Sequence, residues 1–350
     1  MVEDFFLKLV SIASPSGSEA EICNFVKFEL EALRLMTIID KQGNVLSKQV
    51  GKGEPILLCA HLDTVQKKGS VIEPKRVNGH YESAGDTILG ADNKATVASL
   101  LAALKTQNKF KKRNLEIIFS VREETDSGIK GIDLSWIKSK TGITADSGED
   151  IGSIIMETPY IESFGIKVEG VSSHSSEPEK GINALSVASH AISSLDWGNI
   201  DEYSTANIGL IEGGSAVNTT PSEILLKGEI RSYRLDFLNK ALAKLNETFK
   251  TSAKMYRGNV SISHERYCDG YTHDKSDMAI EKVKNIYAHL NFKENYKRSF
   301  GGSDANFFNS KGIKVIDIGD GVKNPHSFKE TISVYDLDKL TDIFSSLIVA

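Results

Sequence analysis

Two residues near the first third of the chain could bind a metal ion or move a proton. His61 and Asp63 stand two residues apart in Cys59-Ala-His61-Leu-Asp63, at the end of an apolar run. Residues two apart on a strand face the same way, so these two side chains can act together. One imidazole nitrogen could bind a metal ion while Asp63 orients the ring, directly or through the backbone. A strand-end histidine that merely satisfies a buried partner is an equally open interpretation.

Further acidic residues and a second histidine stand at comparable positions. Glu123 and Glu124 follow another apolar run, and adjacent carboxylates repel unless they are solvated or held by cations. Asp92 precedes a helix-forming segment, where an aspartate is most often an N-cap. Asp146 and His326 lie in short turns, and either one alone is ordinary loop chemistry. Each of these residues, taken singly, is open to a structural interpretation.

The interpretation changes if one sheet carries all of these residues to the same edge. Imidazole and carboxylate ligands without thiolates suit zinc or a similar divalent ion. Two ions about 3.5–4 Å apart would explain why so many acids can coexist there. The pattern therefore favours a two-metal centre.

The elements that must position this centre have the pattern of a parallel α/β sheet. Apolar runs at 55–60 and 114–121 predict strands buried on both faces, and 94–106 between them predicts a helix. The order strand, helix, strand argues for parallel pairing. Two short helices open the chain, and Ser18 is expected to cap the second.

From residue 160 the sequence predicts strands and helices in the order βαββαβ. This order is typical of a split βαβ sandwich, which is a complete small domain. After it, helix and strand signals typical of the first part return. We therefore expect a discontinuous catalytic domain at 1–160 and 268–350, interrupted by an inserted domain at 161–267. The segments of the inserted domain are predicted at 161–171, 181–195, 206–211, 223–231, 235–254 and 259–267.

Composition argues against nucleic-acid-binding and membrane-spanning proteins. The chain has 350 residues, 42 basic and 47 acidic, a net charge of −5, and 40% hydrophobic residues, as is typical of globular proteins. No basic surface for nucleic acid and no apolar run long enough for a membrane span is encoded. Three widely spaced cysteines and an acidic N-terminus without a signal peptide predict a cytoplasmic location.

The ordered motifs HLD, GADNKA, REET, ADSG and NPHSF resemble those of the M20 family of zinc peptidases and deacylases, most closely its peptidase T branch. The resemblance covers essentially the whole chain. It implies a zinc-exopeptidase-like α/β fold, a mostly parallel sheet flanked by helices, with an inserted ferredoxin-like lid or dimerisation domain. It also implies a short peptide substrate and two Zn²⁺ per subunit, with Co²⁺ or Mn²⁺ as alternatives.

The resemblance assigns roles around the metals. His61 and Asp146 would hold one zinc, Glu124 and His326 the other, and Asp92 would bridge them. Glu123 would be the general base, and Asp63 would support His61. A cis peptide is implied between Asp92 and Asn93, where the family often has Asp-Asp. The other five histidines, which fall outside the motifs, are read as surface or core residues: His80, His190, His264, His273 and His289.

Candidates for contact with substrate are implied elsewhere. His174 matches the family's lid histidine, which stabilises an oxyanion; without the resemblance it reads as a solvated loop residue. Asn218 and Arg231 match positions that hold a substrate carboxylate or carbonyl, although a salt bridge at a strand end is an equal alternative for Arg231. The stretch that would let backbone approach substrate is Gly301, Gly302 and Ser303.

Asp146 bears on the choice of reaction, because aspartate at this position resembles aminopeptidase and dipeptidase members and glutamate is typical of carboxypeptidase and desuccinylase members. The expected function is a di-zinc exopeptidase acting at the N-terminus of short peptides, such as tripeptides. A dipeptidase or an N-acyl amino acid deacylase of the same family is the alternative. A non-catalytic binding protein on this scaffold ranks below both. The family often pairs through its inserted domain, so a homodimer stays open.

Overall fold

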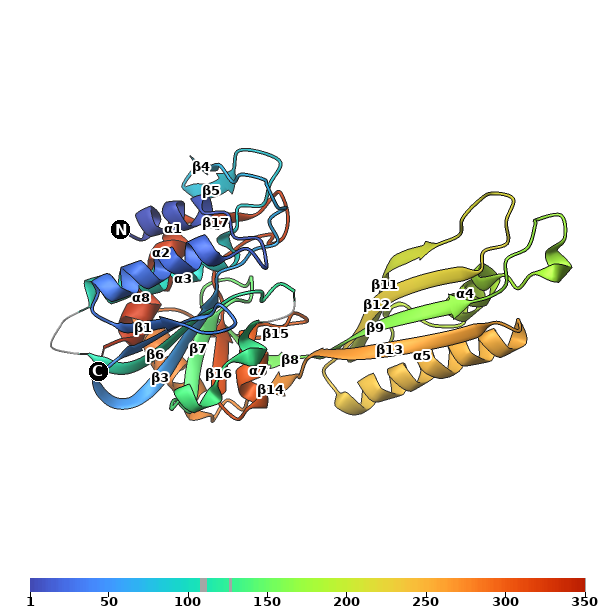
Figure 1. Ribbon diagram of the computed structural model, residues 1–350. Coiled ribbons are helices and arrows are strands. Elements are labelled where there is room, and N and C mark those ends of the chain that lie inside the picture. Colours follow the sequence, from blue (N-terminus) through green and yellow to red (C-terminus); the bar gives the residue numbers. More distant parts are fainter. Residues whose placement is uncertain (108–111, 126–127, 350) are drawn as a thin grey trace. The chain divides into compact units, whose positions relative to one another are not determined.

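The structure is a computed structural model that describes residues 1–107, 112–125 and 128–349. The chain divides into two compact units (Figure 1). Unit 1 comprises Met1–Glu157 and Thr272–Ala350, and unit 2 comprises Thr158–Tyr271. The sequence placed these boundaries at 160/161 and 267/268, a few residues inside those of the structure.

Unit 1 is built on a mixed sheet whose central strands are parallel. The strand order is β1-β2-β6-β3-β7-β16-β8-β14, with β15 paired to β8. The four central strands β6, β3, β7 and β16 run parallel to one another. These strands are β1 (Met36–Ile39), β2 (Val45–Gln49), β3 (Lys52–His61), β6 (Arg113–Ser120), β7 (Thr141–Ala145), β8 (Ser153–Thr158), β14 (Tyr271–Thr272), β15 (Asn295–Arg298) and β16 (Lys314–Ile318).

Helices flank this sheet because its central strands are apolar on both sides. All residues of β3 from Ile56 to His61 are buried, as the unbroken apolar run predicts. Helices α1, α3 and α8 pack together, whereas α7 contacts β3, β7 and β16. The helices are α1 (Val2–Ser11), α2 (Ala20–Ala32), α3 (Ala91–Thr106), α6 (Met278–His289), α7 (Asp304–Ser310) and α8 (Val334–Leu347). The N-cap of α2 is Glu19, so the prediction for Ser18 is wrong.

A small antiparallel sheet and two 3₁₀ turns complete unit 1. The strand order is β17-β5-β4, with β4 (Pro74–Val77), β5 (His80–Ser83) and β17 (Thr331–Ser333). The 3₁₀ turns are η1 (Gly128–Gly131) and η2 (Leu134–Trp136). This sheet was not predicted from the sequence, and its strand β17 follows the loop that carries His326.

Unit 2 is an antiparallel sheet of order β10-β11-β12-β9-β13. Its elements are β9 (Tyr160–Glu169), η3 (Pro178–Lys180), α4 (Ala184–Ser193), β10 (Gly198–Asn199), β11 (Ser204–Gly213), β12 (Glu223–Ser232), α5 (Leu235–Met255) and β13 (Asn259–Cys268). Alternate residues Phe164, Ile166 and Val168 of β9 join side chains of α4 and α5 in one core, so both helices cover the same face. Apart from the two-residue β10, the order is the predicted βαββαβ, and the predicted fold class is confirmed.

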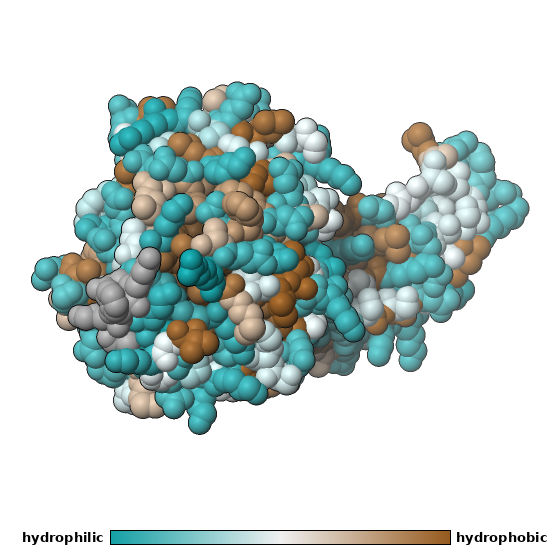
Figure 2. Space-filling view, turned by 60° about the vertical axis from the view of Figure 1, so that its left-hand side comes forward, coloured by the Kyte–Doolittle hydropathy of each residue, from teal (hydrophilic) through white to brown (hydrophobic). Residues whose placement is uncertain are grey.

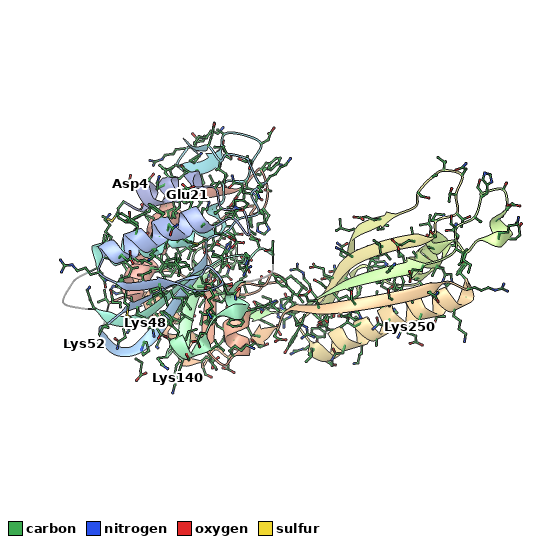
Figure 3. All side chains as sticks on the ribbon, viewed as in Figure 1. Asp4, Glu21, Lys48, Lys52, Lys140 and Lys250 are labelled. Carbon is green, nitrogen blue, oxygen red and sulfur yellow. The ribbon has the colours of Figure 1, made fainter. Side chains whose placement is uncertain are left out.

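The surface mixes hydrophilic and hydrophobic residues, as the face drawn in Figure 2 shows. Figure 3 labels charged side chains of both signs, such as Glu21 and Lys250. Within the described ranges, no helix of the chain has the length and apolar character needed to cross a lipid bilayer.

Candidate metal centre

Three of the five predicted metal ligands of unit 1 lie at or just after the carboxyl ends of its central strands. His61 is the last residue of β3, Asp146 directly follows β7, and Glu124 follows β6 by four residues. Asp92 lies at the start of α3, and His326 lies in the loop between β16 and β17. Because parallel strands end at one edge of a sheet, residues distant in sequence meet there.

The ring of His61 is fixed by its own chain. Nδ1 lies 2.9 Å from the backbone oxygen of Asp63, whereas the carboxylate of Asp63 is 3.6 Å away. A carbonyl can only accept a hydrogen bond, so Nδ1 carries the proton and the lone pair of Nε2 is left for a metal ion. Nε2 faces Asp92 Oδ1 at 3.2 Å and Asp146 Oδ1 at 3.4 Å.

Asp92 occupies an irregular first turn of α3. Its φ and ψ are −79° and 108°, and the peptide bond to Asn93 is cis, as predicted. The N-cap of the helix is Gly90, so Asp92 is not the cap that a local reading would suggest. The amide of Asn93 donates to the carbonyl oxygen of Ala145 at 2.7 Å and to Asp146 Oδ1 at 2.6 Å. Asn93 therefore orients the Asp146 carboxylate.

His326 closes the other side of the cluster. Its Nε2 lies 2.8 Å from Glu124 Oε1 and 3.3 Å from Asp92 Oδ2. The two carboxylate oxygens of Asp92 thus face different histidines, Oδ1 toward His61 and Oδ2 toward His326. This is the arrangement that a bridging carboxylate between two ions requires.

The cluster attracts positive charge. Hydrogen bonds to Asp92 and Glu124 raise the pKa of His326 to about 10. Burial opposes a charge on His61, yet the surrounding carboxylates, Asp146 first, raise the pKa of this imidazole well above its ordinary value. Burial likewise opposes ionisation of Asp92, but hydrogen bonds from His326 and His61 hold the pKa of its carboxyl below the usual range. The carboxylates around the two imidazoles therefore favour a positive charge at this place, whether a proton or a metal ion supplies it.

The donor set fits divalent cations. Ligand atoms of His61, Asp92 and Glu124 lie within 4.8 Å of one another, a spacing that can hold one ion. Asp146 and His326 contact members of this group, as described above. Imidazole nitrogen and carboxylate oxygen are zinc ligands, and these five side chains include no thiolate.

Glu123 is buried beside this cluster, with 8% of its surface exposed. Its backbone N–H donates to Asp63 Oδ1 at 3.0 Å, and the N–H of Glu124 donates to Asp63 Oδ2 at 3.1 Å. Burial raises the pKa of the Glu123 carboxyl well above its ordinary value. A carboxyl with a raised pKa is suited to proton transfer near neutral pH.

Unit 2 brings two of its three predicted residues together. His174 and Thr219 form an isolated antiparallel β-bridge, and the Ser175 N–H donates to the carbonyl oxygen of Asn218 at 2.9 Å. His174 and Asn218 therefore lie in adjacent loops. Arg231 lies near the other end of β12, whose first residue is Glu223. At the rise per residue of an extended strand, the two positions are roughly 27 Å apart. There its Nε donates to Glu229 Oε1 at 2.7 Å.

The predicted glycine-rich stretch precedes α7. Gly301 is exposed and Gly302 half-buried, but Ser303 is buried. The hydroxyl of Ser303 donates to Asp317 Oδ2 at 2.9 Å. The other oxygen of Asp317 accepts the backbone N–H of Asp146 at 2.9 Å. In unit 1, Ser303 is thus linked through Asp317 to the loop of the predicted ligand Asp146.

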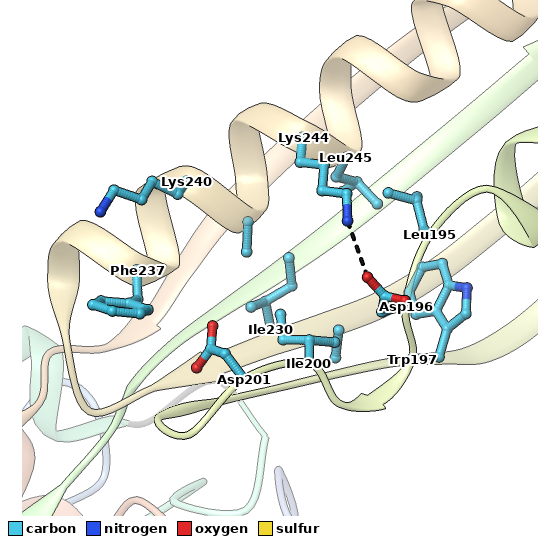
Figure 4. Close-up of a pocket in the computed structure, with 12 residues that line it drawn as sticks. Leu195, Asp196, Trp197, Ile200, Asp201, Ile230, Phe237, Lys240, Lys244 and Leu245 are labelled. Atoms are coloured by element: carbon cyan, nitrogen blue, oxygen red, sulfur yellow. Dashed lines mark hydrogen bonds and ion pairs between the residues drawn. The ribbon is translucent and has the colours of Figure 1, made fainter.

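A separate cavity of about 300 Å³ lies in unit 2 (Figure 4). Trp197, Ile230 and Phe237 contribute to its apolar lining, and Lys244 pairs with Asp196 beside it at 3.0 Å. His174, Asn218 and Arg231 do not line this cavity. The predicted site residues of unit 2 are therefore elsewhere.

Three buried polar residues around the centre were missed in the sequence analysis. Asp317 lies among apolar residues in β16. A single acidic residue in such a run is a signal that its carboxylate is buried and has a partner. Glu330 follows His326 by four residues and is 1% exposed. Lys94 is fully buried and donates to the carbonyl oxygen of Ile12 at 2.8 Å. Burial lowers the pKa of this ammonium to about 7, against the effect of Glu330 and Asp63.

Comparison with known proteins agrees with this geometry. A family model described as a peptidase dimerisation domain matches residues 160–257, which lie in unit 2. The uncharacterised protein YqjE of Bacillus subtilis is 31% identical over 98% of this chain and 96% of its own.

Two solved structures are similar over nearly the whole chain. Aminopeptidase PepT from Bacillus cereus is 29% identical with a TM-score of 0.88, covering 99% of this chain and 97% of its own. A tripeptidase from Staphylococcus aureus is 27% identical with a TM-score of 0.93, covering 99% and 96%. These similarities extend through both units, and the chain accordingly belongs to the M20 family of peptidases and resembles members of the peptidase T branch predicted from its motifs.

Proposed function

We propose that the chain is a two-metal exopeptidase that removes the N-terminal residue from short peptides, tripeptides among them. The observation that carries this proposal is the convergence of five predicted ligands at one sheet edge, with Asp92 between the two histidines. His61 and Asp146 would hold one Zn²⁺, Glu124 and His326 the other, and Asp92 would bridge them. Bound zinc would supply Lewis-acid chemistry that lowers the pKa of water and polarises a carbonyl.

Glu123 is the proposed general base. Its buried carboxylate would accept the proton of the attacking water and return it to the leaving amine nitrogen. The backbone of Glu123 is held by Asp63, which fixes where the carboxylate can act. The raised pKa makes this carboxylate a stronger base for the first step, after which the group holds the proton that the amine receives.

His174 is the proposed donor to the developing oxyanion. The backbone N–H of Ser176 donates to Nδ1 of His174 at 3.2 Å. A backbone N–H cannot accept, so in the neutral ring the proton is on Nε2. Because the side chain is exposed, Nε2–H is available as a donor to substrate. Asn218 and Arg231, with Gly301, Gly302 and Ser303, are proposed to hold the peptide backbone and its carboxylate.

Two observations support peptide rather than N-acyl amino acid hydrolysis. The ligand after β7 is Asp146, as in aminopeptidase members of the family the motifs resemble. The two similar solved structures named above are those of an aminopeptidase and a tripeptidase. Deacylation needs the same amide chemistry, so substrate tests must decide between the two reactions.

The test is a substrate panel with the zinc-loaded full chain. Tri-alanine, di-alanine, N-acetyl-tri-alanine and N-succinyl-alanine separate the alternatives, with products identified by mass spectrometry. We expect release of free alanine from the amino end of tri-alanine and little turnover of the acetylated peptide. Inactivity on every free peptide, or preference for the N-acyl amino acid, would overturn the proposal.

We also propose that unit 2 forms a homodimer interface. The family model of a dimerisation domain supports this, and β10 pairs with only Thr205 and Ala206 of β11. Farther along β11, Leu210 and Ile211 are 57% and 60% exposed. Light scattering after size-exclusion chromatography should give twice the monomer mass, and Ile211→Glu should shift the protein toward the monomer mass.

A cytoplasmic location is the proposed setting for this activity. None of the three cysteines forms a disulfide in the described part of the chain, and Cys23 and Cys59 are buried. Free thiols are expected where glutathione keeps them reduced. Fractionation of the native host, with detection of the protein by antibody, would test this location.

A further inference from the structure

The carboxylate of Glu330 binds the backbone that leads into Asp92. Oε2 accepts the N–H groups of Leu89 and Gly90, each at 2.8 Å. Oε1 accepts the N–H of Asp92 at 2.9 Å. With 1% of its surface exposed, this side chain is almost fully removed from water. A buried carboxylate satisfied by three backbone donors fixes the position of those donors.

Glu330 itself belongs to the loop that carries His326. Lys323 and Thr331 exchange two backbone hydrogen bonds, of 2.9 and 3.0 Å, which close the base of this loop. Within it, Glu330 N–H donates to the carbonyl oxygen of Ser327 at 3.1 Å. The main chain of Glu330 is therefore held by the loop of His326, while its side chain holds the loop of Asp92.

We propose that Glu330 is a positioning residue that sets the spacing between His326 and Asp92, and through it the affinity of the metal centre. This inference rests on the proposed two-metal function. The two loops are separated by more than 230 residues in sequence, yet His326 Nε2 lies 3.3 Å from Asp92 Oδ2. Glu330 joins them directly and contacts neither substrate nor metal in this role.

Only a carboxylate of this length satisfies the donors. In Glu330→Gln, one oxygen becomes an amide group that donates, and it would face a backbone N–H whichever way the amide turns. In Glu330→Asp, both oxygens remain acceptors but are withdrawn by one methylene. We therefore expect the aspartate variant to retain more function than the glutamine variant.

Glu116 provides a matched control. It is also a buried glutamate, 3% exposed, whose Oε2 accepts the backbone N–H groups of Lys138 and Ser139, each at 2.8 Å. Its other partner, Lys48, is labelled in Figure 3. Glu116 lies on β6 four residues before its end and contacts the segment after η2. Glu116→Gln should cost stability without changing the metal centre.

The experiment titrates Zn²⁺ into metal-stripped full-length protein against a fluorescent chelator, with circular dichroism and thermal unfolding of each variant as a check of folding. We expect Glu330→Gln to bind Zn²⁺ about 10–100-fold more weakly than wild type, the range typical for loss of a group that orients metal ligands. Glu330→Asp should fall between them, and Glu116→Gln should match wild type. The variant affinities are compared at 25 °C, where folding is verified.

The outcomes separate the two proposals. If wild type binds Zn²⁺ and folded Glu330→Gln binds it equally well, the positioning role is refuted. An equal loss in Glu330→Gln and Glu116→Gln would also refute it, because the effect would then follow general stability. If wild type itself binds no Zn²⁺, the proposed metal centre fails. Should Glu330→Gln not fold, the graded loss in Glu330→Asp decides the matter.

Discussion

The carboxylate of Asp63 accepts the backbone N–H of Glu123 at 3.0 Å. The same side chain accepts the N–H of Glu124 at 3.1 Å and the hydroxyl of Ser16 at 2.7 Å. The imidazole of His61 instead reaches the backbone oxygen of Asp63. Of the two routes by which Asp63 could orient the histidine, the structure uses the backbone, and the carboxylate holds the Glu123-Glu124 loop.

Asp63→Asn should lower kcat about 10–100-fold, because the new amide group would face one of the two backbone donors that place Glu123. The zinc site of His61 should change less, since its contact is with the backbone. Ser16→Ala, which removes only the hydroxyl donor, serves as the control and should retain most activity. Steady-state kinetics beside zinc titration checks this; unchanged kcat in folded Asp63→Asn would contradict it.

Replacing the base should separate chemistry from metal binding. Glu123→Ala should retain its zinc and lose about 10²–10⁴-fold in kcat, the usual range for general base catalysis. Glu124→Ala, its neighbour, should instead lose zinc, because Glu124 contacts His326 at 2.8 Å as a proposed ligand. Metal content by mass spectrometry and kcat on tri-alanine give the comparison. A fully active Glu123→Ala would refute the assignment.

Gly90 should tolerate no side chain. Its φ is +71°, and an added Cβ would lie 3.3 Å from Ile72 Cδ1 and 3.4 Å from Thr64 Cγ2. Gly79 has a similar φ of +82° with nothing within 4 Å. Gly79→Ala should therefore cost about 1–2 kcal/mol of unfolding free energy from backbone strain alone. Gly90→Ala should cost more, as measured by urea denaturation, and an equal loss would show that the crowding does not matter.

Thiol reactivity should follow burial. Burial raises the pKa of Cys23 to about 12, so little thiolate forms at pH 8. Cys59 is fully buried, whereas Cys268 is half-buried. Iodoacetamide should therefore modify Cys268 first, and Cys23 and Cys59 only in urea, as followed by peptide mass mapping. Labelling of Cys23 in the native protein at the rate of Cys268 would contradict this expectation.

His273 should make unit 1 sensitive to acid. Burial lowers the pKa of its imidazole, opposed by the carbonyl of Val315 and by Asp277 and assisted by Lys314. The unfolded chain then binds the proton more tightly than the folded protein. Stability is complete above the ordinary pKa of about 6.5 and falls as pH drops below it.

The variant His273→Gln keeps an amide donor for Val315 but cannot titrate. Its free energy of unfolding, measured by urea denaturation, should fall less than that of wild type between pH 7 and pH 5. His289, which lies at the end of α6 and is exposed, offers the control His289→Gln. Parallel pH profiles for wild type and His273→Gln would count against the buried histidine as a source of acid sensitivity.

The positions and order of the longer strands and helices could be predicted from local sequence patterns. The buried run before His61 and the order of segments in unit 2 follow from the spacing of apolar residues, which sets strand and helix faces directly. His61, Asp92 and Asp146 stand at a strand end or helix start, where parallel topology brings side chains to one edge. His326 lies in a loop, and its role, like the other ligand roles, was predicted from the family resemblance of the motifs. The short β1–β2 and β4–β5 hairpins were not predicted, because each strand has too few residues for a clear pattern.

Tertiary structure decided how these residues are held. Glu330 reaches Gly90 across 240 residues, and Asp317 reaches Asp146 across 171, contacts that no local pattern encodes. The hydroxyl of Ser303, expected to meet substrate, is bonded to Asp317. A buried polar group must find a partner wherever the fold supplies one. The sequence therefore determined which residues could bind metal, and only the packed chain determined which buried carboxylates orient them.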